Sequence, residues 1–179
     1  MEFDKVVKKR KMIRRYERSK PIPKPIIDKL IENAHRAPSA GHTQVQEFVI
    51  VTDPSVKSKL AEAALGQDQV KEAATLIVVC SNFSRSLSRY GNRGKEFYSI
   101  IDGAFSSMLI LLSSVNEGLG ACFVGAFQDN KIAKILNLPN HVKPIGIVTL
   151  GYPAEKPGSF ERMDISKLVY YERYGRNKH

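Results

Sequence analysis

The sequence predicts an α+β fold in one domain that spans residues 1–179. Segments with the helical spacing of apolar residues alternate along the chain with short β-branched segments. No Gly-x-Gly-x-x-Gly motif follows a strand, and Gly118-Leu119-Gly120 comes after a helix and before a strand, which reverses the dinucleotide-binding order. The length suits a single hydrophobic core. These observations disfavour a Rossmann fold.

The helical segments are identified by their spacing and by their end signals. Asp53-Pro54 combines a capping acid with Pro at the first helical position, which marks the start of a helix. Residues 96–116 are apolar around most of the helix, which indicates a helix that is buried or shared between subunits. Helices are expected at residues 3–7, 25–37, 54–65, 96–116 and 129–136.

Strands are expected at residues 47–52, 75–81, 121–124 and 144–152. The second of them is nearly all apolar, so we expect it to be covered on both faces. The charge-dense residues 10–19 are interpreted as a loop or turn, and residues 82–96 as a mobile loop. The polar tail, residues 153–179, is expected to wrap over another surface.

The net charge of +10 is unevenly distributed, because residues 1–24 carry ten Lys and Arg but only three acids. Such a segment fits nucleic acid, a membrane surface or a phosphorylated small molecule. Cys80 and Cys122 lie in apolar strand-like segments, which predicts buried, reduced thiols in a cytoplasmic protein. No metal-ligand spacing, secretion signal or membrane span is expected from the sequence.

The loop between the second helix and the first strand is the most informative stretch. Pro38 and Gly41 fix its shape, while Ser39, His42 and Gln44 add hydrogen-bonding groups. Small residues let the backbone approach a flat polar ring closely. An ordinary helix stop followed by a turn would have the same composition.

Several motifs in order along the chain resemble the FMN-dependent nitroreductase superfamily. They are RKMIRRY (10–16), the loop PSAGH (38–42), RYGNRG (89–94), GLGACFVGAF (118–127) and LGYPAEKP (150–157). The resemblance extends from about residue 10 to residue 162. It implies a three-layer α-β-α fold with a mixed, mostly antiparallel sheet, and a homodimer with FMN at the interface.

The resemblance also implies which residues bind the cofactor. Those assigned to the FMN phosphate are Arg10, Arg14 and Arg162, with Lys11 and the Met12 backbone nearby. Those assigned to the ribityl chain and ring edge are Pro38, Ser39, Ala40, Gly41, His42 and Gln44, with Gln67 at the pyrimidine and Gly125 and Ala126 near the flavin N5. His42 stands where relatives often have Asn, and Met12 stands where a Ser is frequent.

The implied activity is a ping-pong cycle in which NADH or NADPH passes hydride to the flavin N5. A nitroaromatic, quinone or related small electron acceptor then takes the electrons, and no catalytic side chain or metal is expected. One alternative is a flavin-consuming or reductive dehalogenase-type member of the same superfamily. A basic nucleic-acid-binding module is disfavoured, because the cations lack interleaved aromatic residues. The segment Arg85–Arg93 either covers the site or is a solvated surface, and no nucleic-acid or membrane partner is expected.

Overall fold

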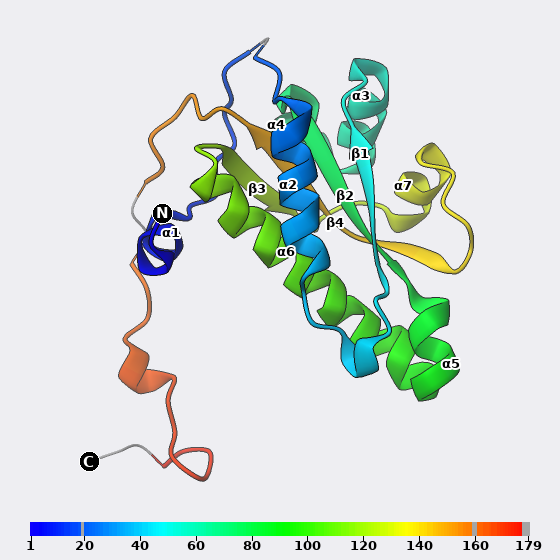
Figure 1. The fold of residues 1–179 in the computed structure, drawn as a ribbon, viewed down its shortest axis with the longest axis vertical. Helices are drawn as coiled ribbons and strands as arrows, with labels where there is room; N and C mark the ends of the chain where they lie inside the picture. Colours follow the sequence, from blue (N-terminus) through cyan, green and yellow to red (C-terminus); the bar gives the residue numbers. More distant parts are fainter. Residues whose placement is uncertain (19, 159–160, 177–179) are drawn as a thin grey trace.

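The computed structural model describes residues 1–18, 20–158 and 161–176, and a four-stranded sheet forms its centre (Figure 1). The strands are β1 (Gln46–Val51), β2 (Thr75–Asn82), β3 (Gly120–Val124) and β4 (Val142–Gly151). They lie in the order β1-β2-β4-β3, and every neighbouring pair is antiparallel. The four predicted strands are confirmed, with ends that shift by one or two residues.

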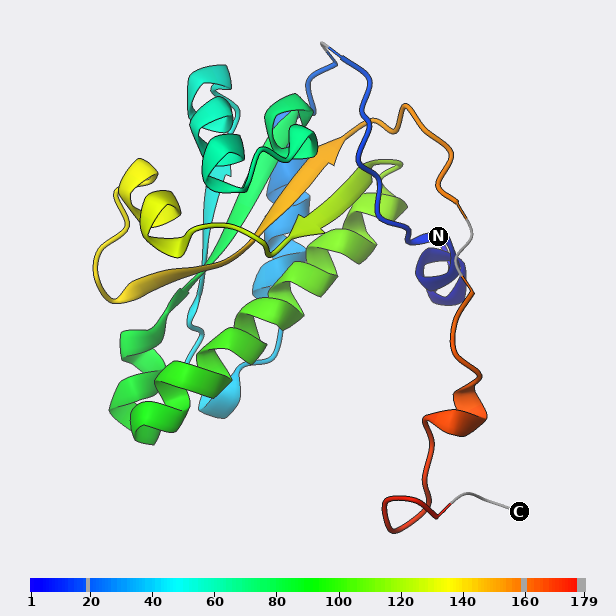
Figure 2. The same cartoon turned by 180° about the vertical axis from the view of Figure 1, so that it is seen from behind.

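Helices cover both faces of the sheet, which confirms the three-layer α-β-α prediction (Figures 1 and 2). Side chains alternate along β2, so Ile77 and Val79 pack on one face while Leu76 and Val78 pack on the other. All of β2 is buried, as predicted. The helices on the first face are α2 (Lys24–His35) and α6 (Ser99–Asn116), and those on the second are α3 (Pro54–Ala63), α4 (Asp68–Glu72) and α7 (Asp129–Ile135).

The buried face of α6 mixes polar and apolar residues, and part of its apolar surface faces outward. Asp102, Ser106 and Ser107 are buried, as are Ile110 and Leu111. Phe105 and Met108 point outward and are 46% and 48% exposed. The described residues leave this outer face of α6 uncovered. Exposed apolar surface of this kind is typical of an interaction site.

The predicted mobile loop at residues 82–96 is wrong, because this segment is helical. It forms α5 (Phe83–Arg93) and a π-helical turn, η2 (Gly94–Tyr98), which leads into α6. Gly91 bends α5 by adopting a φ of 58°, a conformation open mainly to glycine. The rings of Tyr90 and Tyr98 pack edge to face across this bend at a centroid distance of 5.2 Å, and this contact orders the segment.

The N-terminus lies beside the C-terminal end of α6. Helix α1 (Phe3–Lys9) begins after Met1, whose amino group donates to Asn116 Oδ1 at 2.9 Å. The tail leaves the body of the molecule and contains a short 3₁₀ turn, η3 (Ile165–Lys167) (Figures 1 and 2). Its described part exposes apolar side chains, so the prediction that it wraps over another surface stays a prediction. Residues 19, 159–160 and 177–179 of the predicted loop and tail lie outside the described residues.

Other features bear on the sequence predictions for cysteines and membranes. Cys80 and Cys122 are free and buried, which confirms the predicted buried thiols. The helical stretch Phe83–Asn116 is long and apolar enough to cross a membrane by length and composition alone. This is weak evidence for a span, since core helices pass the same test and α6 packs against the sheet.

Candidate functional site

The basic segment after α1 is a loop over its described residues, as predicted, and isolated bridges attach it to the edge of the sheet. Ile13 N donates to Ala121 O at 2.9 Å, next to an isolated parallel bridge between Met12 and Ala121. Ile13 and Tyr16 are buried, and the Tyr16 hydroxyl lies 2.6 Å from Thr149 Oγ1. Burial raises the pKa of Tyr16, so it stays protonated. These anchors hold the two intervening arginines, Arg14 and Arg15, at the surface.

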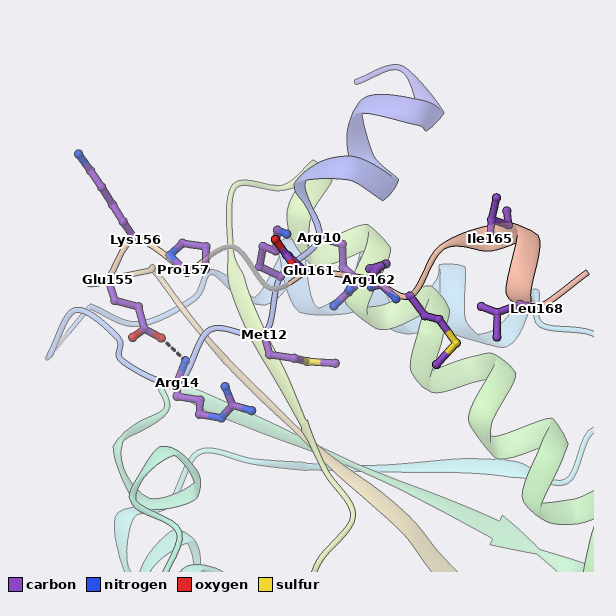
Figure 3. Close-up of a pocket in the computed structure, with 13 residues that line it drawn as sticks. Arg10, Met12, Arg14, Glu155, Lys156, Pro157, Glu161, Arg162, Ile165 and Leu168 are labelled. Carbon is purple, nitrogen blue, oxygen red and sulfur yellow. Dashed lines mark hydrogen bonds between the residues drawn. The ribbon is translucent and has the colours of Figure 1, made fainter.

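Cations from this segment and from the tail line one cavity of about 1040 Å³ (Figure 3). Its charged residues are Arg10, Lys11, Arg14, Lys156 and Arg162 on the cationic side and Glu155 and Glu161 on the acidic side. Met12 also lines it. Within the described part of the chain, Arg10, Arg14 and Arg162 form no ion pair. The cavity therefore has an excess of positive charge with open donors.

The side chain of Glu155 contacts the backbone of the basic segment. The sequence analysis did not single out this residue. Its Oε1 accepts hydrogen bonds from Arg14 N at 2.6 Å and from Arg15 N at 3.2 Å (Figure 3). These hydrogen bonds lower the pKa of Glu155 and keep it charged. The signal was an acid shortly after the last strand, which ends at Gly151. Its carboxylate holds the arginine backbone and leaves the guanidinium groups free.

The loop at residues 38–44 has an unusual backbone. It contains a 3₁₀ turn, η1 (Ala40–His42), in which Gly41 has a φ of 54°. His42 and Gln44 also have positive φ values, 58° and 48°, which are uncommon for residues with a side chain. Ser39 Oγ accepts from Gln44 N at 3.0 Å, and the His42 ring lies 2.9 Å from Gln44 Nε2. Strained backbone conformations of this kind cluster at functional sites, and an ordinary turn after a helix does not require them.

Hydrogen bonds to helices α5 and α6 hold this loop in place. Ala40 N donates to both carboxylate oxygens of Asp102, at 3.1 and 3.2 Å. Arg89 Nη1 donates to Gly41 O at 2.6 Å, and Arg85 Nη1 donates to Gln44 O, also at 2.6 Å.

Burial raises the pKa of Asp102, while the hydrogen bond from Ala40 opposes this shift. Sequence reasoning missed Asp102 as an anchor. A lone acid inside a long apolar helix was the signal that could have found it.

Gln67 and Ala126, two predicted site residues from distant parts of the chain, are in contact. Gln67 Nε2 donates to Ala126 O at 3.0 Å and to Ala64 O at 2.9 Å. Gln69 Nε2 donates to Gln67 Oε1 at 2.9 Å. The Gln67 amide is thus occupied in holding the bend after β3, where the backbone of Gly125 and Ala126 is exposed.

The structure does not bring all predicted site residues together in one chain. The loop at residues 38–44 is attached to Asp102 in the first turn of α6, whereas the N-terminus is attached to Asn116 at its end. The 18 residues of α6 span about 27 Å. The basic segment and the loop therefore lie at opposite ends of this helix. Among the described residues, no group of three or more His, Cys, Asp or Glu side chains is placed to hold a metal.

Comparisons with known proteins agree with this architecture. The model of the nitroreductase family matches residues 7–74 and 63–152. The chain is 31% identical to an NADH dehydrogenase of Thermus thermophilus, over 91% of this chain and 92% of that protein. It is 26% identical to an FMN reductase (NAD(P)H) of Bacillus subtilis, over 86% and 67%.

A solved nitroreductase family protein of Clostridium novyi has the same fold. Its TM-score is 0.78 at 28% identity, with 99% of this chain and 97% of that chain covered. The match to the family model extends over most of the chain and includes all four strands. The chain therefore belongs to the nitroreductase family.

Proposed function

We propose that this protein is an FMN-dependent oxidoreductase that transfers electrons from NADH or NADPH to a nitroaromatic, quinone or related small acceptor. The observation that carries the proposal is the cavity at the basic end. Arg10, Arg14 and Arg162 line it and form no ion pair among the described residues. The similarity to the FMN reductase of Bacillus subtilis supports the same cofactor.

The residues at the basic end fit the phosphate of FMN. A phosphate monoester carries nearly two negative charges at pH 7 and offers three strong acceptor oxygens. The planar guanidinium fork of arginine matches that geometry, and Lys11 adds a further cation to the same cavity. Glu155 does not neutralise the cations through side-chain pairing, because its Oε1 is bonded to backbone N–H groups.

The flavin ring fits against the bend after β3. The backbone of Gly125 and Ala126 is exposed there, and a Cβ added to Gly125 would approach Phe123 at 3.2 Å. A residue without a side chain lets a flat ring approach this backbone. Gln67 holds Ala126 O in place and thereby shapes the surface on which the ring would lie.

We further propose that each FMN lies between two copies of the chain. One copy contributes the basic segment and the bend after β3, and the other contributes Pro38 to His42 and Gln44. Two observations support this arrangement: these groups lie at opposite ends of α6, and the outer face of that helix exposes Phe105 and Met108. A two-fold dimer would bury the same apolar face on both subunits.

In this arrangement the protein binds and orients the cofactor and excludes solvent from it. When bound, FMN supplies two-electron transfer from NAD(P)H to the acceptor, one substrate after the other. The arginines hold the phosphate, the strained loop lies along the ribityl chain and ring edge, and no side chain is assigned a catalytic role. We also propose that residues 1–179 form one domain of a cytoplasmic protein, a location that the two free thiols favour.

A visible absorbance spectrum of the purified protein tests the proposal, with the released chromophore identified after denaturation. We expect flavin bands, about one FMN per subunit, and oxidation of NADH or NADPH that depends on a quinone or nitroaromatic. A colourless protein that fails to bind added FMN would contradict the proposal. Bound flavin without turnover of either acceptor class would favour the flavin-consuming or dehalogenase-type alternative.

A further inference from the structure

Helix α5 and the turn η2 carry a second group of cations, away from the cavity at the basic end. Arg85, Arg89, Arg93 and Lys95 all lie within this short segment, against the single acid Glu96. The segment lies directly on the loop at residues 38–44, because Arg85 and Arg89 bond two of its carbonyls. A ligand bound to these cations would therefore be next to the proposed flavin site.

The first two arginines differ in how much of their donor capacity is used. Arg85 donates to Gln44 O and to Glu47 Oε1, both at 2.6 Å, so its charge is paired. Arg89 bonds Gly41 O through one nitrogen, and its guanidinium lies 5.6 Å from the centre of the Tyr90 ring. Among the described residues Arg89 has no carboxylate partner, so its other donors remain open.

Arg93 is held in place on aromatic rings. Its guanidinium lies 4.7 Å from the Phe97 ring centre and 5.3 Å from that of Tyr98, and its Nε donates to the Tyr98 hydroxyl at 3.1 Å. No carboxylate of the described chain pairs with it. Stacking fixes the plane of a guanidinium and leaves its terminal N–H groups free for a planar, bidentate anion contact.

Arg89 and Arg93 belong to one assembly, because Tyr90 and Tyr98 pack against each other between them. Gly91, where α5 bends, lies between the two arginines in the sequence. Two oriented guanidinium groups with open donors form a site for a ligand with more than one negative charge.

We propose that Arg89 and Arg93 bind the phosphate groups of NADH or NADPH. The inference rests on the proposed function and names its electron donor as the ligand of this surface. A nicotinamide dinucleotide carries a charged pyrophosphate that projects away from its reactive ring. A neutral quinone or nitroaromatic needs no such cations, so the surface selects the donor and leaves the acceptor unrestricted.

Equilibrium binding of oxidised nucleotides to the FMN-loaded protein tests this assignment without turnover. The probes are NAD⁺, NADP⁺ and nicotinamide riboside, which has the same ring and no phosphate. The variants are Arg93→Gln, Arg93→Lys and Arg89→Gln. The control is Arg18→Gln, which removes the same charge from an 84% exposed side chain paired with Glu72. FMN content and melting temperature are measured for each variant to confirm folding.

We expect Arg93→Gln to weaken NAD⁺ or NADP⁺ binding about tenfold, the usual effect of losing one charge-assisted contact. Arg93→Lys should fall between the wild type and Arg93→Gln, because it keeps the charge but loses the fork. Nicotinamide riboside binding and the KM of a neutral quinone should stay within about twofold in both Arg93 variants, and Arg18→Gln should match the wild type.

Unchanged nucleotide binding in both Gln variants would overturn the inference, as would equal weakening of nicotinamide riboside. A raised KM for free FMN as acceptor, with dinucleotide binding intact, would also overturn it. A failure of the proposed function is distinguishable, because the wild-type flavin would then not be reduced by NADH or NADPH whatever the variants do.

Discussion

The two ends of the proposed cofactor site are built in opposite ways. At the basic end, the backbone is anchored by Ile13, Tyr16 and Glu155, but the guanidinium groups of Arg10 and Arg14 have no ionic partner among the described residues. At the loop end, bonds from two other helices hold the carbonyls and one N–H of residues 38–44 in a strained shape.

This difference separates binding by charge from binding by shape. An anion that enters the basic end displaces no internal ion pair, so its charge-assisted bonds contribute directly to affinity. The loop presents a fixed surface whose own hydrogen bonds are already made, so its contribution is contact area and position. Substitutions at the basic end should therefore change cofactor affinity with little effect on stability, whereas substitutions at the loop end should change stability and, through the shape of the loop, cofactor affinity as well.

The largest effect is expected from Arg14→Ala at the basic end. Losing charge-assisted contacts to a phosphate should weaken FMN binding tenfold to a hundredfold, as an order-of-magnitude expectation. Fluorescence titration of the flavin-stripped protein with FMN measures this, and the unfolding free energy should change little because the side chain is exposed. Arg18→Ala is the matched control, and equal FMN affinity of the two variants would contradict the phosphate assignment.

The same Gly→Ala change at both ends sharpens the comparison. Gly41 has a φ of 54°, and an added Cβ would meet the Tyr90 hydroxyl and the Arg89 guanidinium. Gly41→Ala should lower the free energy of unfolding by about 2 kcal/mol through left-handed strain and displaced side chains. Gly158, which lines the basic cavity, has open space around its Cβ position, so Gly158→Ala should change it by less than about 0.5 kcal/mol.

Denaturant unfolding of both variants separates these expectations. Equal stabilities would show that the loop is not held in the strained conformation that we describe.

The two carboxylates, one at each end, should respond to pH with opposite signs. Burial raises the pKa of Asp102, so its contribution to stability is fully present below its ordinary pKa and is lost as the pH rises past it. Backbone hydrogen bonds lower the pKa of Glu155, so its contribution is present above its ordinary pKa and is lost as the pH falls.

Urea unfolding between about pH 2.5 and about pH 7 should therefore show opposite slopes for the wild-type minus variant differences of Asp102→Asn and Glu155→Gln, at roughly the pH values where acids titrate. Parallel slopes would contradict the environments described for these two side chains.

The smallest effect is expected from Arg85→Gln. Its pair with Glu47 is partly exposed, and such pairs contribute less than about 1 kcal/mol to stability. The loss of its bond to Gln44 O adds a similar amount at most. Thermal melting should therefore place this variant much closer to the wild type than Gly41→Ala, and the reverse order would show that the Arg85 contacts dominate the loop.

Local patterns in the sequence were sufficient for most of the fold. The apolar strand at residues 75–81 and the capping pair Asp53-Pro54 identify β2 and the start of α3 correctly, because each signal depends on near neighbours. The segment at residues 82–96 was misassigned because its order depends on the contact between Tyr90 and Tyr98 across a bend at Gly91. Such contacts do not appear in a local pattern.

The same distinction between local signals and long-range contacts applies to the candidate site. The family resemblance predicts that Arg10, Arg14 and Arg162 bind the FMN phosphate. These three residues line one cavity, and their binding of phosphate stays a prediction. It did not indicate that Asp102 fastens Ala40 or that Glu155 holds the Arg14 backbone, because both bonds join residues that are far apart in sequence. Gln67 was expected at the flavin, and the structure uses its amide to hold Ala126.

The most direct test of the central claim, that each FMN is bound across two chains, is the FMN content of mixed dimers. One chain carries Arg14→Ala and the other Gly41→Ala, with different affinity tags so that only mixed dimers are purified. Across two chains, both defects fall in one site and the second site stays intact. We predict one tightly bound FMN per mixed dimer and weak binding in both parent dimers. Weak binding in the mixed dimer as well would contradict the claim, because it would show that the two ends of a single chain bind the same FMN.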